Sequence, residues 1–396
     1  MDLQLTDRVV LVVGGAGYIG SAIAERAREE GATVVVASRH PGAAHHEDDP
    51  VRELKIHPPT LATRAPPTID GARHRPRGGS SGPRHHGGQM TTTFGDGVLF
   101  FPVTPFDSHD RVDEALLEQL VADGLRHGAG GVFAACGTGE FHALSVEEHA
   151  VAVRAAVRAA AGGVPVVAGT GGPLGHALAC ARGAAEAGAD ALLVLPPYLV
   201  TGNQEGLVRY VEAIAAASGL PVIAYHRANA AFTVAGVRRL LEVPGLIGIK
   251  DGVGDIALMQ AFVLAARAAG RDDVLFFNGL LTAEMSQAAY TAIGVPRYSS
   301  AVFAMAPEIA TALSTALESG DEAARTRLLD QFYGPLVRLR DETPGFAVSL
   351  IKAGLRLGGA RVGSVRPPLT DPTADQERRL AALLEAGRAL VAGAPR

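Results

Sequence analysis

Lys250 is the residue with the clearest capacity for chemistry in this chain of 396 residues. The sequence has only three lysines, Lys55, Lys250 and Lys352, and its other 33 Lys-or-Arg positions are all arginine, so it hardly uses lysine as a surface cation. Lys250 lies in the apolar run Leu246-Ile247-Gly248-Ile249-Lys250-Asp251-Gly252. A lysine can lose its proton and attack a carbonyl, whereas an arginine cannot. We therefore predict a nucleophilic lysine; the alternative is a lysine salt-bridged at a strand end.

Lys250 belongs to a series of short apolar runs that alternate with alanine-rich helical stretches from Met90 onward. Eight such units in about 220 residues predict an α/β fold, a (β/α)8 TIM barrel over residues 90–306. Residues 307–396 are rich in Ala, Leu and Arg and predict a C-terminal helical extension. The candidate strands are residues 97–103, 131–135, 164–169, 191–195, 221–225, 246–250, 274–278 and 295–299, and helical patterns between them include residues 113–127, 145–161 and 175–187.

Tyr225 ends the fifth predicted strand, and Lys250 ends the sixth. Reactive groups in such barrels lie at the C-terminal ends of the strands, and successive strands are neighbours. We therefore predict that the two side chains come within hydrogen-bonding reach, as a lysine nucleophile beside a phenol that relays protons. Burial disfavours the charged ammonium and so favours the reactive amine. The alternative for Tyr225 is a core tyrosine whose hydroxyl reaches the edge of the barrel.

The ends of the second, fifth, seventh and eighth predicted strands, on the same rim, carry candidate substrate-binding residues. Thr138 and Gly139 lie in a glycine-rich turn whose backbone N–H groups and hydroxyl suit a carboxylate, although such turns are also common simply as tight loops. Arg227 could hold a second carboxylate, or it could pair with an acidic neighbour, Asp251 or Glu140. The remaining candidates end the seventh and eighth strands and are Asn278 and Ser299.

The overall composition excludes several classes of function. Hydrophobic residues make up 47% of the chain and charged residues 19%, which is typical of a soluble globular protein. A net charge of −5 gives no electrostatic case for binding nucleic acid or an anionic membrane. No apolar run is long enough to span a bilayer, and the N-terminus lacks the order of a signal peptide. The two cysteines, Cys136 and Cys180, have no metal-ligand spacing, so we expect a cytoplasmic protein with neither a disulfide nor a metal site.

Residues 1–89 differ in character from the rest. Residues 1–40 read as strand, helix and strand, with Gly14, Gly17 and Gly20 where a pyrophosphate would meet a helix N-terminus. This resembles the opening βαβ unit of the short-chain dehydrogenase family. No tyrosine in the chain has a lysine four residues later, as that family's reductase chemistry requires, so an NAD(P)-dependent reductase is the less favoured alternative. We expect this segment to be a fusion remnant or to precede the working start at Met90.

Residues 41–89 are expected to form a disordered linker. Residues 41–90 contain 8 Pro and 7 Gly and show no hydrophobic periodicity. Two His-His pairs, His45-His46 and His85-His86, occur there, but a solvated tract of this composition implies no fixed metal geometry.

Several motifs in order from residue 90 resemble the dihydrodipicolinate synthase/N-acetylneuraminate lyase superfamily, and within it the 5-dehydro-4-deoxyglucarate dehydratases. The motifs are Phe100-Phe101-Pro102-Val103-Thr104-Pro105-Phe106, Gly137-Thr138-Gly139-Glu140-Phe141, Leu195-Pro196-Pro197-Tyr198-Leu199, Ile247-Gly248-Ile249-Lys250-Asp251-Gly252, Arg297-Tyr298-Ser299-Ser300-Ala301-Val302-Phe303, Gly345-Phe346-Ala347-Val348-Ser349-Leu350-Ile351-Lys352-Ala353-Gly354 and Val365-Arg366-Pro367-Pro368-Leu369. The sequence departs from the superfamily pattern at Gly137, Leu199, His226 and Ala228.

The resemblance implies a hydro-lyase that removes water and CO2 from 5-dehydro-4-deoxy-D-glucarate and yields 2,5-dioxopentanoate. A Schiff base on Lys250 would carry this reaction without a cofactor, and Tyr225 would relay protons. The alternative within the same fold is another pyruvate-type aldolase or synthase that uses the same lysine. The resemblance also implies a homo-oligomer, by analogy a tetramer, that acts on a small acidic keto-sugar.

Overall fold

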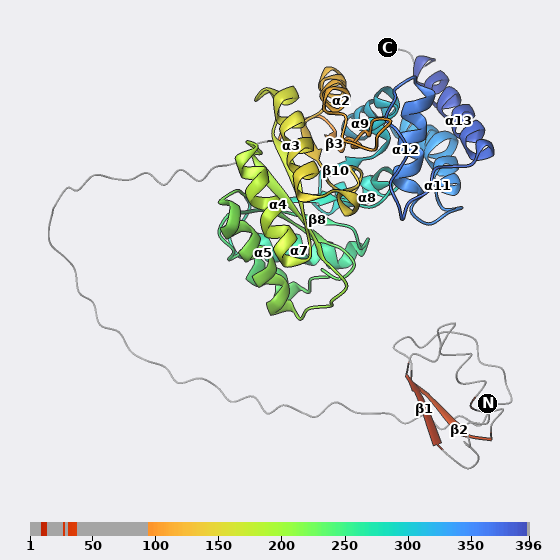
Figure 1. Cartoon of the computed structure of the whole chain (residues 1–396). Coiled ribbons are helices and arrows are strands. Elements are labelled where there is room, and N and C mark those ends of the chain that lie inside the picture. Colours follow the sequence, from red (N-terminus) through yellow and green to blue (C-terminus); the bar gives the residue numbers. More distant parts are fainter. Residues whose placement is uncertain (1–8, 14–26, 28–30, 38–93, 394–396) are drawn as a thin grey trace, which may run out of the picture. The chain divides into compact units, whose positions relative to one another are not determined.

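The computed structural model describes residues 9–13, 27, 31–37 and 94–393, and the chain divides into two compact units, residues 1–84 and 85–396 (Figure 1). In the first unit, strands β1 (Val9–Val13) and β2 (Thr33–Ala37) pair in parallel, as expected for the two strands of a βαβ unit. The predicted glycine-rich turn, most of the predicted helix after it, the predicted linker and its His-His pairs lie outside the described residues.

The second unit contains the predicted parallel barrel. Its eight strands close in the order β10-β3-β4-β5-β6-β7-β8-β9, so that each strand lies beside its neighbours in the chain and the last strand pairs with the first. The fold class inferred from the alternation of apolar and helical segments is confirmed. The strands are β3 (Leu99–Phe100), β4 (Gly131–Ala134), β5 (Val166–Gly172), β6 (Ala191–Pro197), β7 (Val222–His226), β8 (Leu246–Asp251), β9 (Leu275–Asn278) and β10 (Arg297–Ser300).

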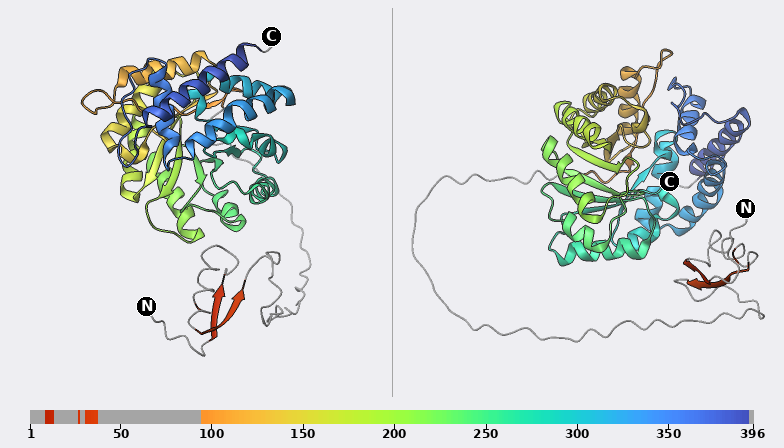
Figure 2. Two further views of the ribbon diagram at one scale, coloured as in Figure 1. Left: turned by 90° about the vertical axis from the view of Figure 1, so that its right-hand side faces the viewer. Right: turned by 60° about the horizontal axis from the view of Figure 1, so that its bottom comes forward.

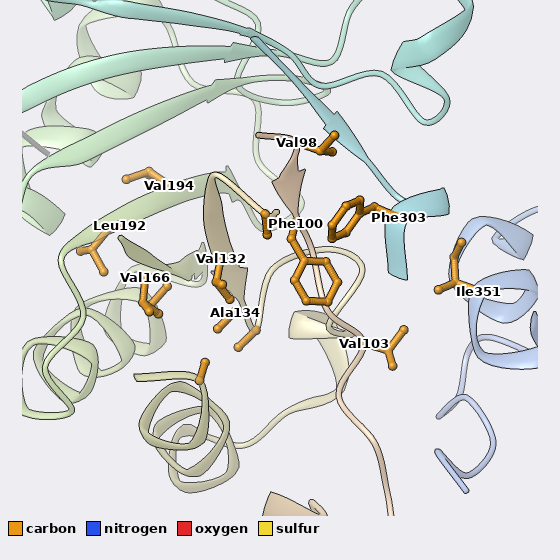
Figure 3. Close-up of a cluster of buried hydrophobic side chains, with 14 of the residues drawn as sticks. Val98, Phe100, Val103, Val132, Ala134, Val166, Leu192, Val194, Phe303 and Ile351 are labelled. Atoms are coloured by element: carbon orange, nitrogen blue, oxygen red, sulfur yellow. The ribbon is translucent and has the colours of Figure 1, made fainter. Parts of the chain in front are cut away.

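Alternate residues of each strand face the two sides of the barrel wall. Phe133, Leu193 and Phe277 belong to a smaller buried cluster, and the residues next to them, such as Val132 and Leu192, belong to a larger one. The larger cluster lies between strands and helices, and Figure 3 shows Val132, Leu192 and their neighbours within it. Both faces of the strands are therefore buried, as expected for a parallel barrel. On β8 this alternation gives Ile249 to the larger cluster and turns the next residue, Lys250, toward the interior.

Helices surround the barrel and extend beyond it (Figure 1). Side-chain caps begin several of them: Asp113 accepts from Leu116 N, and Ser145 forms a capping box with Glu148. The helices are α2 (Glu114–Arg126), α3 (Val146–Ala160), α4 (Leu174–Glu186), α5 (Gln204–Ser218), α6 (Val234–Leu240), α7 (Ile256–Ala268), α8 (Gln287–Ala292), α9 (Pro307–Ser319), α10 (Glu322–Leu328), α11 (Gly334–Arg340), α12 (Phe346–Leu357) and α13 (Ala374–Ala392).

The helical C-terminal region gathers on one side of the barrel, in blue in Figure 2. Helix α9 follows β10 in the place of the barrel's eighth helix, so the helices beyond eight βα units are α10–α13. The predicted boundary at residue 306 falls just before α9, and the division of residues 90–396 at this point stays a prediction. Ile351 of α12 joins the larger buried cluster with Val103 and Phe303, so the extension shares the core of the barrel (Figure 3). No helix of the described residues is both long and apolar enough to cross a membrane.

Candidate active site

Lys250 and Tyr225 lie side by side at the ends of β8 and β7. The two residues are direct partners in the parallel register of these strands. The Lys250 side chain is buried, and its Nζ lies 4.3 Å from the ring centroid of Tyr225 and 4.5 Å from that of Phe101. Among the described residues no carboxylate pairs with Lys250, and β9 places Phe277 on its other side. The structure thus brings the two predicted catalytic residues together, and the predicted alternative of a salt-bridged Lys250 is not observed there.

Two glycines make room for these side chains. A Cβ built on Gly279 would lie 2.5 Å from Lys250 Cε and 2.6 Å from its Cγ, so the lysine stem runs directly across this residue. A Cβ on Gly252 would lie 2.8 Å from the Tyr225 ring and 3.0 Å from its hydroxyl oxygen. Any larger residue at either position would displace a predicted catalytic group, because the packing leaves no free volume.

The Tyr225 hydroxyl is held by two hydrogen bonds. It donates to the carbonyl of Gly279 at 2.8 Å and accepts from Arg227 Nη1 at 3.0 Å. Burial favours the neutral phenol, but the positive charges of Lys250 and Arg227 outweigh burial and lower the pKa of Tyr225 below its ordinary value. A phenol that is easier to deprotonate and fixed beside an amine is well suited to exchange protons with groups bound at that amine.

These groups face a cavity of about 380 Å³ at the end of the barrel. Its lining combines a few polar side chains with a largely apolar wall, which is typical of small-molecule sites. The polar side chains are Thr138, His142, Tyr225, Arg227, Lys250 and Ser299. The apolar wall includes Phe101, Phe141, Leu193, Leu195, Leu280, Leu281, Val348 and Leu369.

Three of the five predicted substrate-binding residues line this cavity, namely Thr138, Arg227 and Ser299. Gly139 does not: it packs behind the turn, where its carbonyl accepts from Thr104 Oγ1 at 2.7 Å. Asn278 does not either, because its amide nitrogen donates to Ala283 O and to the side chains of Ser286 and Gln287, in the following loop and at the start of α8. The structure therefore makes Asn278 a support for that loop and does not bring it to the cavity.

The turn over residues 137–139 retains free donors. Its backbone N–H groups have no hydrogen-bond acceptor among the described residues, while the next two residues donate back to Gly137 O and Cys136 O. Arg227 has neither of its alternative partners, because Glu140 pairs with Lys352 and Asp251 accepts from Tyr290 and from the N–H groups of the next loop. Gly137, Thr138 and Arg227 line the cavity, so N–H donors of the turn and the guanidinium of Arg227 are available there.

His226, the last residue of β7 and a departure from the superfamily pattern, does not line the cavity. Its Nδ1 accepts from Phe232 N at 2.8 Å, and burial lowers its pKa against the opposing charge of Asp251. His226 therefore closes the loop after β7. Ala228 in that loop adopts a left-handed conformation with φ of 48°.

Sequence reasoning missed the contribution of the C-terminal extension to the site. The first turn of α12 lines the cavity through Ala347 and Val348, and Leu369 adds to the same wall. The motif at residues 345–354 contributes to the family resemblance but does not by itself predict a place at the site. Its one chemical signal was Lys352, a second lysine in a chain that hardly uses lysine.

Comparisons with known proteins agree with this geometry. A family model described as the dihydrodipicolinate synthetase family matches residues 95–387. A protein of Streptomyces griseus named probable 5-dehydro-4-deoxyglucarate dehydratase is 54% identical over 297 residues, which cover 75% of this chain and 93% of that protein. A protein of the same name from Paracidovorax citrulli is 41% identical over 298 residues, covering 75% of this chain and 97% of its own length.

Solved structures resemble the same region. A dihydrodipicolinate synthase of Oceanobacillus iheyensis superposes with a TM-score of 0.69 at 25% identity and covers 76% of this chain and 99% of its own. One from Acinetobacter baumannii, solved with pyruvate, gives a TM-score of 0.64 at 27% identity and covers 75% of this chain and 99% of its own. The NAD dependent epimerase/dehydratase family matches residues 10–67, consistent with the predicted nucleotide-binding resemblance of the N-terminal segment.

The fold and the site define a (β/α)8 barrel that presents a buried lysine and a tyrosine at neighbouring strand ends. The match over residues 95–387 and the relatives of up to 54% identity make the particular assignment: the chain belongs to the dihydrodipicolinate synthetase family.

Proposed function

We propose that this chain is a hydro-lyase that converts 5-dehydro-4-deoxy-D-glucarate into 2,5-dioxopentanoate, CO2 and water. The observation that carries the proposal is Lys250, a buried amine without a carboxylate partner among the described residues, whose Nζ faces Tyr225 at the cavity. The relatives of 40–54% identity support the choice of substrate, because they are named 5-dehydro-4-deoxyglucarate dehydratases.

The first chemical step is the attack of Lys250 Nζ on the substrate ketone. Loss of water from the resulting carbinolamine gives an iminium, which is an electron sink for the carbons next to it. Tyr225 donates and accepts the protons of this step, since its hydroxyl is fixed at the same end of the barrel. A structure of a dihydrodipicolinate synthase from Acinetobacter baumannii was solved with pyruvate, which supports a 2-oxo acid as the ketone substrate.

Elimination and decarboxylation follow on the iminium. Removal of a proton at C4 gives an enamine, whose electrons expel the hydroxyl group at C3 as water and leave a conjugated iminium. The bond between C1 and C2 then breaks, its electron pair enters the conjugated system, and C1 leaves as CO2. Protonation, tautomerisation of the enol at C2 to an aldehyde, and hydrolysis of the iminium release 2,5-dioxopentanoate and free Lys250.

We assign the binding of the two carboxylates to opposite parts of the cavity. The N–H groups of the 137–139 turn and the Thr138 hydroxyl suit the carboxylate next to the ketone. Arg227 suits the distant carboxylate, and Ser299 suits a substrate hydroxyl. Three exposed apolar residues, Tyr198, Leu199 and Val200, support a homo-oligomer, by analogy a tetramer. Two free buried thiols, Cys136 and Cys180, fit a cytoplasmic location.

Turnover of the keto-sugar acid tests the proposal directly. The purified chain is incubated with 5-dehydro-4-deoxy-D-glucarate, and CO2 and the semialdehyde product are measured together in a one-to-one ratio. No product, combined with turnover of pyruvate and an aldehyde acceptor, would instead assign the aldolase or synthase alternative. Tyr225→Phe should lower kcat by about 10²–10⁴-fold, whereas Tyr210→Phe, whose hydroxyl binds Gly172 O away from the cavity, should leave kcat unchanged.

A further inference from the structure

Two walls of the cavity come from distant parts of the chain, and one buried ion pair joins them. One wall is the 137–139 turn, and the other is the first turn of α12, which contributes Val348. Directly after the turn, Glu140 forms an ion pair with Lys352 of α12, with 2.6 Å between Oε1 and Nζ. Both side chains are 0% exposed, and neither lines the cavity.

The spacing along the chain connects this pair to the site. Glu140 lies two residues after Thr138, and Lys352 lies four residues after Val348, on the same face of α12. Glu140 also has a left-handed backbone, with φ of 56°. This conformation is sparsely populated by residues other than glycine and persists only where neighbouring contacts hold it. The ion pair is such a contact, so it helps to hold the backbone conformation at the end of the turn.

Each residue of the pair also forms a hydrogen bond with the backbone of the C-terminal extension. Glu140 Oε2 accepts from Arg366 N at 2.8 Å, and Lys352 Nζ donates to Ser364 O at 3.0 Å. The same Nζ lies 4.1 Å from the ring centroid of Phe106. The carboxylate that fixes the turn is therefore anchored at two points of the C-terminal extension, through α12 and through the segment that precedes Leu369.

We propose that Glu140 and Lys352 are positioning residues through which the C-terminal extension sets the 137–139 turn to bind the carboxylate next to the ketone. The inference rests on the proposed function, because it assumes a 2-oxo acid on Lys250. Replacing a buried ion pair by neutral residues of similar volume is often harmless to stability. We therefore expect the pair to contribute to the geometry of the carboxylate site more than to stability.

The variants must separate geometry from folding. Lys352→Met alone leaves the Glu140 charge buried without its partner and is prone to unfold. The double variant Glu140→Gln/Lys352→Met removes both charges and keeps both volumes, so it should fold with a Tm near that of the wild type. The control is Glu308→Gln/Arg388→Met, which makes the same changes in a more exposed ion pair between α9 and α13, away from the cavity.

Reductive trapping with two ketones provides the measurement. Borohydride fixes a bound ketone onto Lys250, and the mass gain is followed as a function of ketone concentration for pyruvate and for acetone, which lacks the carboxylate. In the double variant we expect the half-saturating pyruvate concentration to rise at least tenfold, while trapping of acetone stays within twofold of the wild type. The control variant should match the wild type with both ketones.

Two results would overturn the inference. One is an unchanged half-saturating concentration of pyruvate in the folded double variant. The other is an equal loss of trapping for pyruvate and acetone, which would make the pair a support of the whole fold. The proposed function fails separately, when the wild type traps pyruvate but does not turn over the keto-sugar acid. A wild type that traps neither ketone would refute both proposals.

Discussion

Two buried lysines lie close to this cavity, and their surroundings differ in one respect. Lys250 and Lys352 are both at most 7% exposed, and both place Nζ within 4.5 Å of the centroid of an aromatic ring. Lys352 also has a carboxylate at 2.6 Å and a carbonyl at 3.0 Å. Lys250 has no carboxylate partner among the residues that the structure describes, and its Nζ faces the cavity.

In the proposed mechanism, this difference separates a nucleophilic lysine from a structural one. A carboxylate in contact stabilises the ammonium form and occupies its protons, so the nitrogen has no free electron pair. An aromatic wall excludes water without fixing the proton in the same way. The pKa of Lys352 is lowered by burial, against the charge of Glu140, but its Nζ contacts Glu140 and Ser364 O, and Lys352 does not line the cavity. Burial alone therefore does not identify the nucleophile.

The largest expected effect distinguishes the two lysines by chemistry. Lys250→Met should lower turnover by about 10⁴-fold or more, as expected when an essential nucleophile is removed, and should abolish borohydride-dependent mass gain. Circular dichroism and thermal unfolding show whether the variant is folded. Mass gain on a second lysine in folded Lys250→Met would contradict the contrast between the two sites.

Removal of Lys352, the lysine that is paired with a carboxylate, should lower the stability of the fold. Lys352→Met leaves Glu140 buried without a counter-charge, and we expect the free energy of unfolding to fall by about 3–5 kcal/mol. Urea unfolding of this variant, of Glu140→Gln and of the double variant completes a double-mutant cycle. A loss of less than about 1 kcal/mol in Lys352→Met would show that the pair is not effectively buried in solution.

Much of the fold and part of this contrast were predictable from the sequence. The strands are short apolar runs with local boundaries, and the chain order of a (β/α)8 barrel makes consecutive strands neighbours. The approach of Tyr225 to Lys250 followed from that rule alone, and their register partnership confirms it. Strand length was less predictable: β3 has two residues, Leu99–Phe100, where residues 97–103 were expected, and Pro102 in that run has no N–H to donate.

The parts of the site that sequence reasoning missed depend on contacts between distant segments. Most of the barrel lies between Glu140 and Lys352 along the chain. The sequence around either residue does not predict that the two form an ion pair. Asn278 shows the opposite error, because its position at a strand end predicted a role at the cavity. Its side chain instead bonds to the loop that follows. The direction of a side chain at a strand end depends on how it packs against its neighbours, and this packing cannot be read from a single sequence.

Glu284 extends the comparison from lysines to acids, because no basic side chain of the described residues forms an ion pair with this buried carboxyl group. Glu284 is 2% exposed, and its Oε1 accepts from Ser300 Oγ at 2.6 Å. Burial raises the pKa of Glu284 to about 7, although the Ser300 hydrogen bond and the charge of Arg340 oppose the shift. The folded chain therefore keeps this proton up to about pH 7, while the unfolded chain releases it near its ordinary pKa of about 4.5.

Stability should consequently fall as the pH rises through this window. Between about pH 4.5 and 7 the folded state binds more protons than the unfolded state, so the free energy of unfolding decreases by about 3 kcal/mol. Glu284→Gln removes this decrease, and its stability relative to the wild type should grow by about that amount from pH 5 to pH 8 in urea titrations. The same change at exposed Glu186 is the control, and parallel pH profiles for Glu284→Gln and the wild type would contradict the prediction.

The smallest effect concerns how the unpartnered lysine is held in place. Gly279→Ala adds a methyl group whose Cβ would lie 2.5 Å from Lys250 Cε, so the lysine or the loop must move. A displacement of about 1 Å at the nucleophile costs about 10²-fold in rate, and kcat should fall by that factor while the variant stays folded. Gly175→Ala on α4, where no atom lies within 4 Å of the added Cβ, is the matched control. Equal kcat values for the two variants would mean that Lys250 reaches its reactive position without the contact to Gly279, and its placement would then depend on the aromatic rings alone.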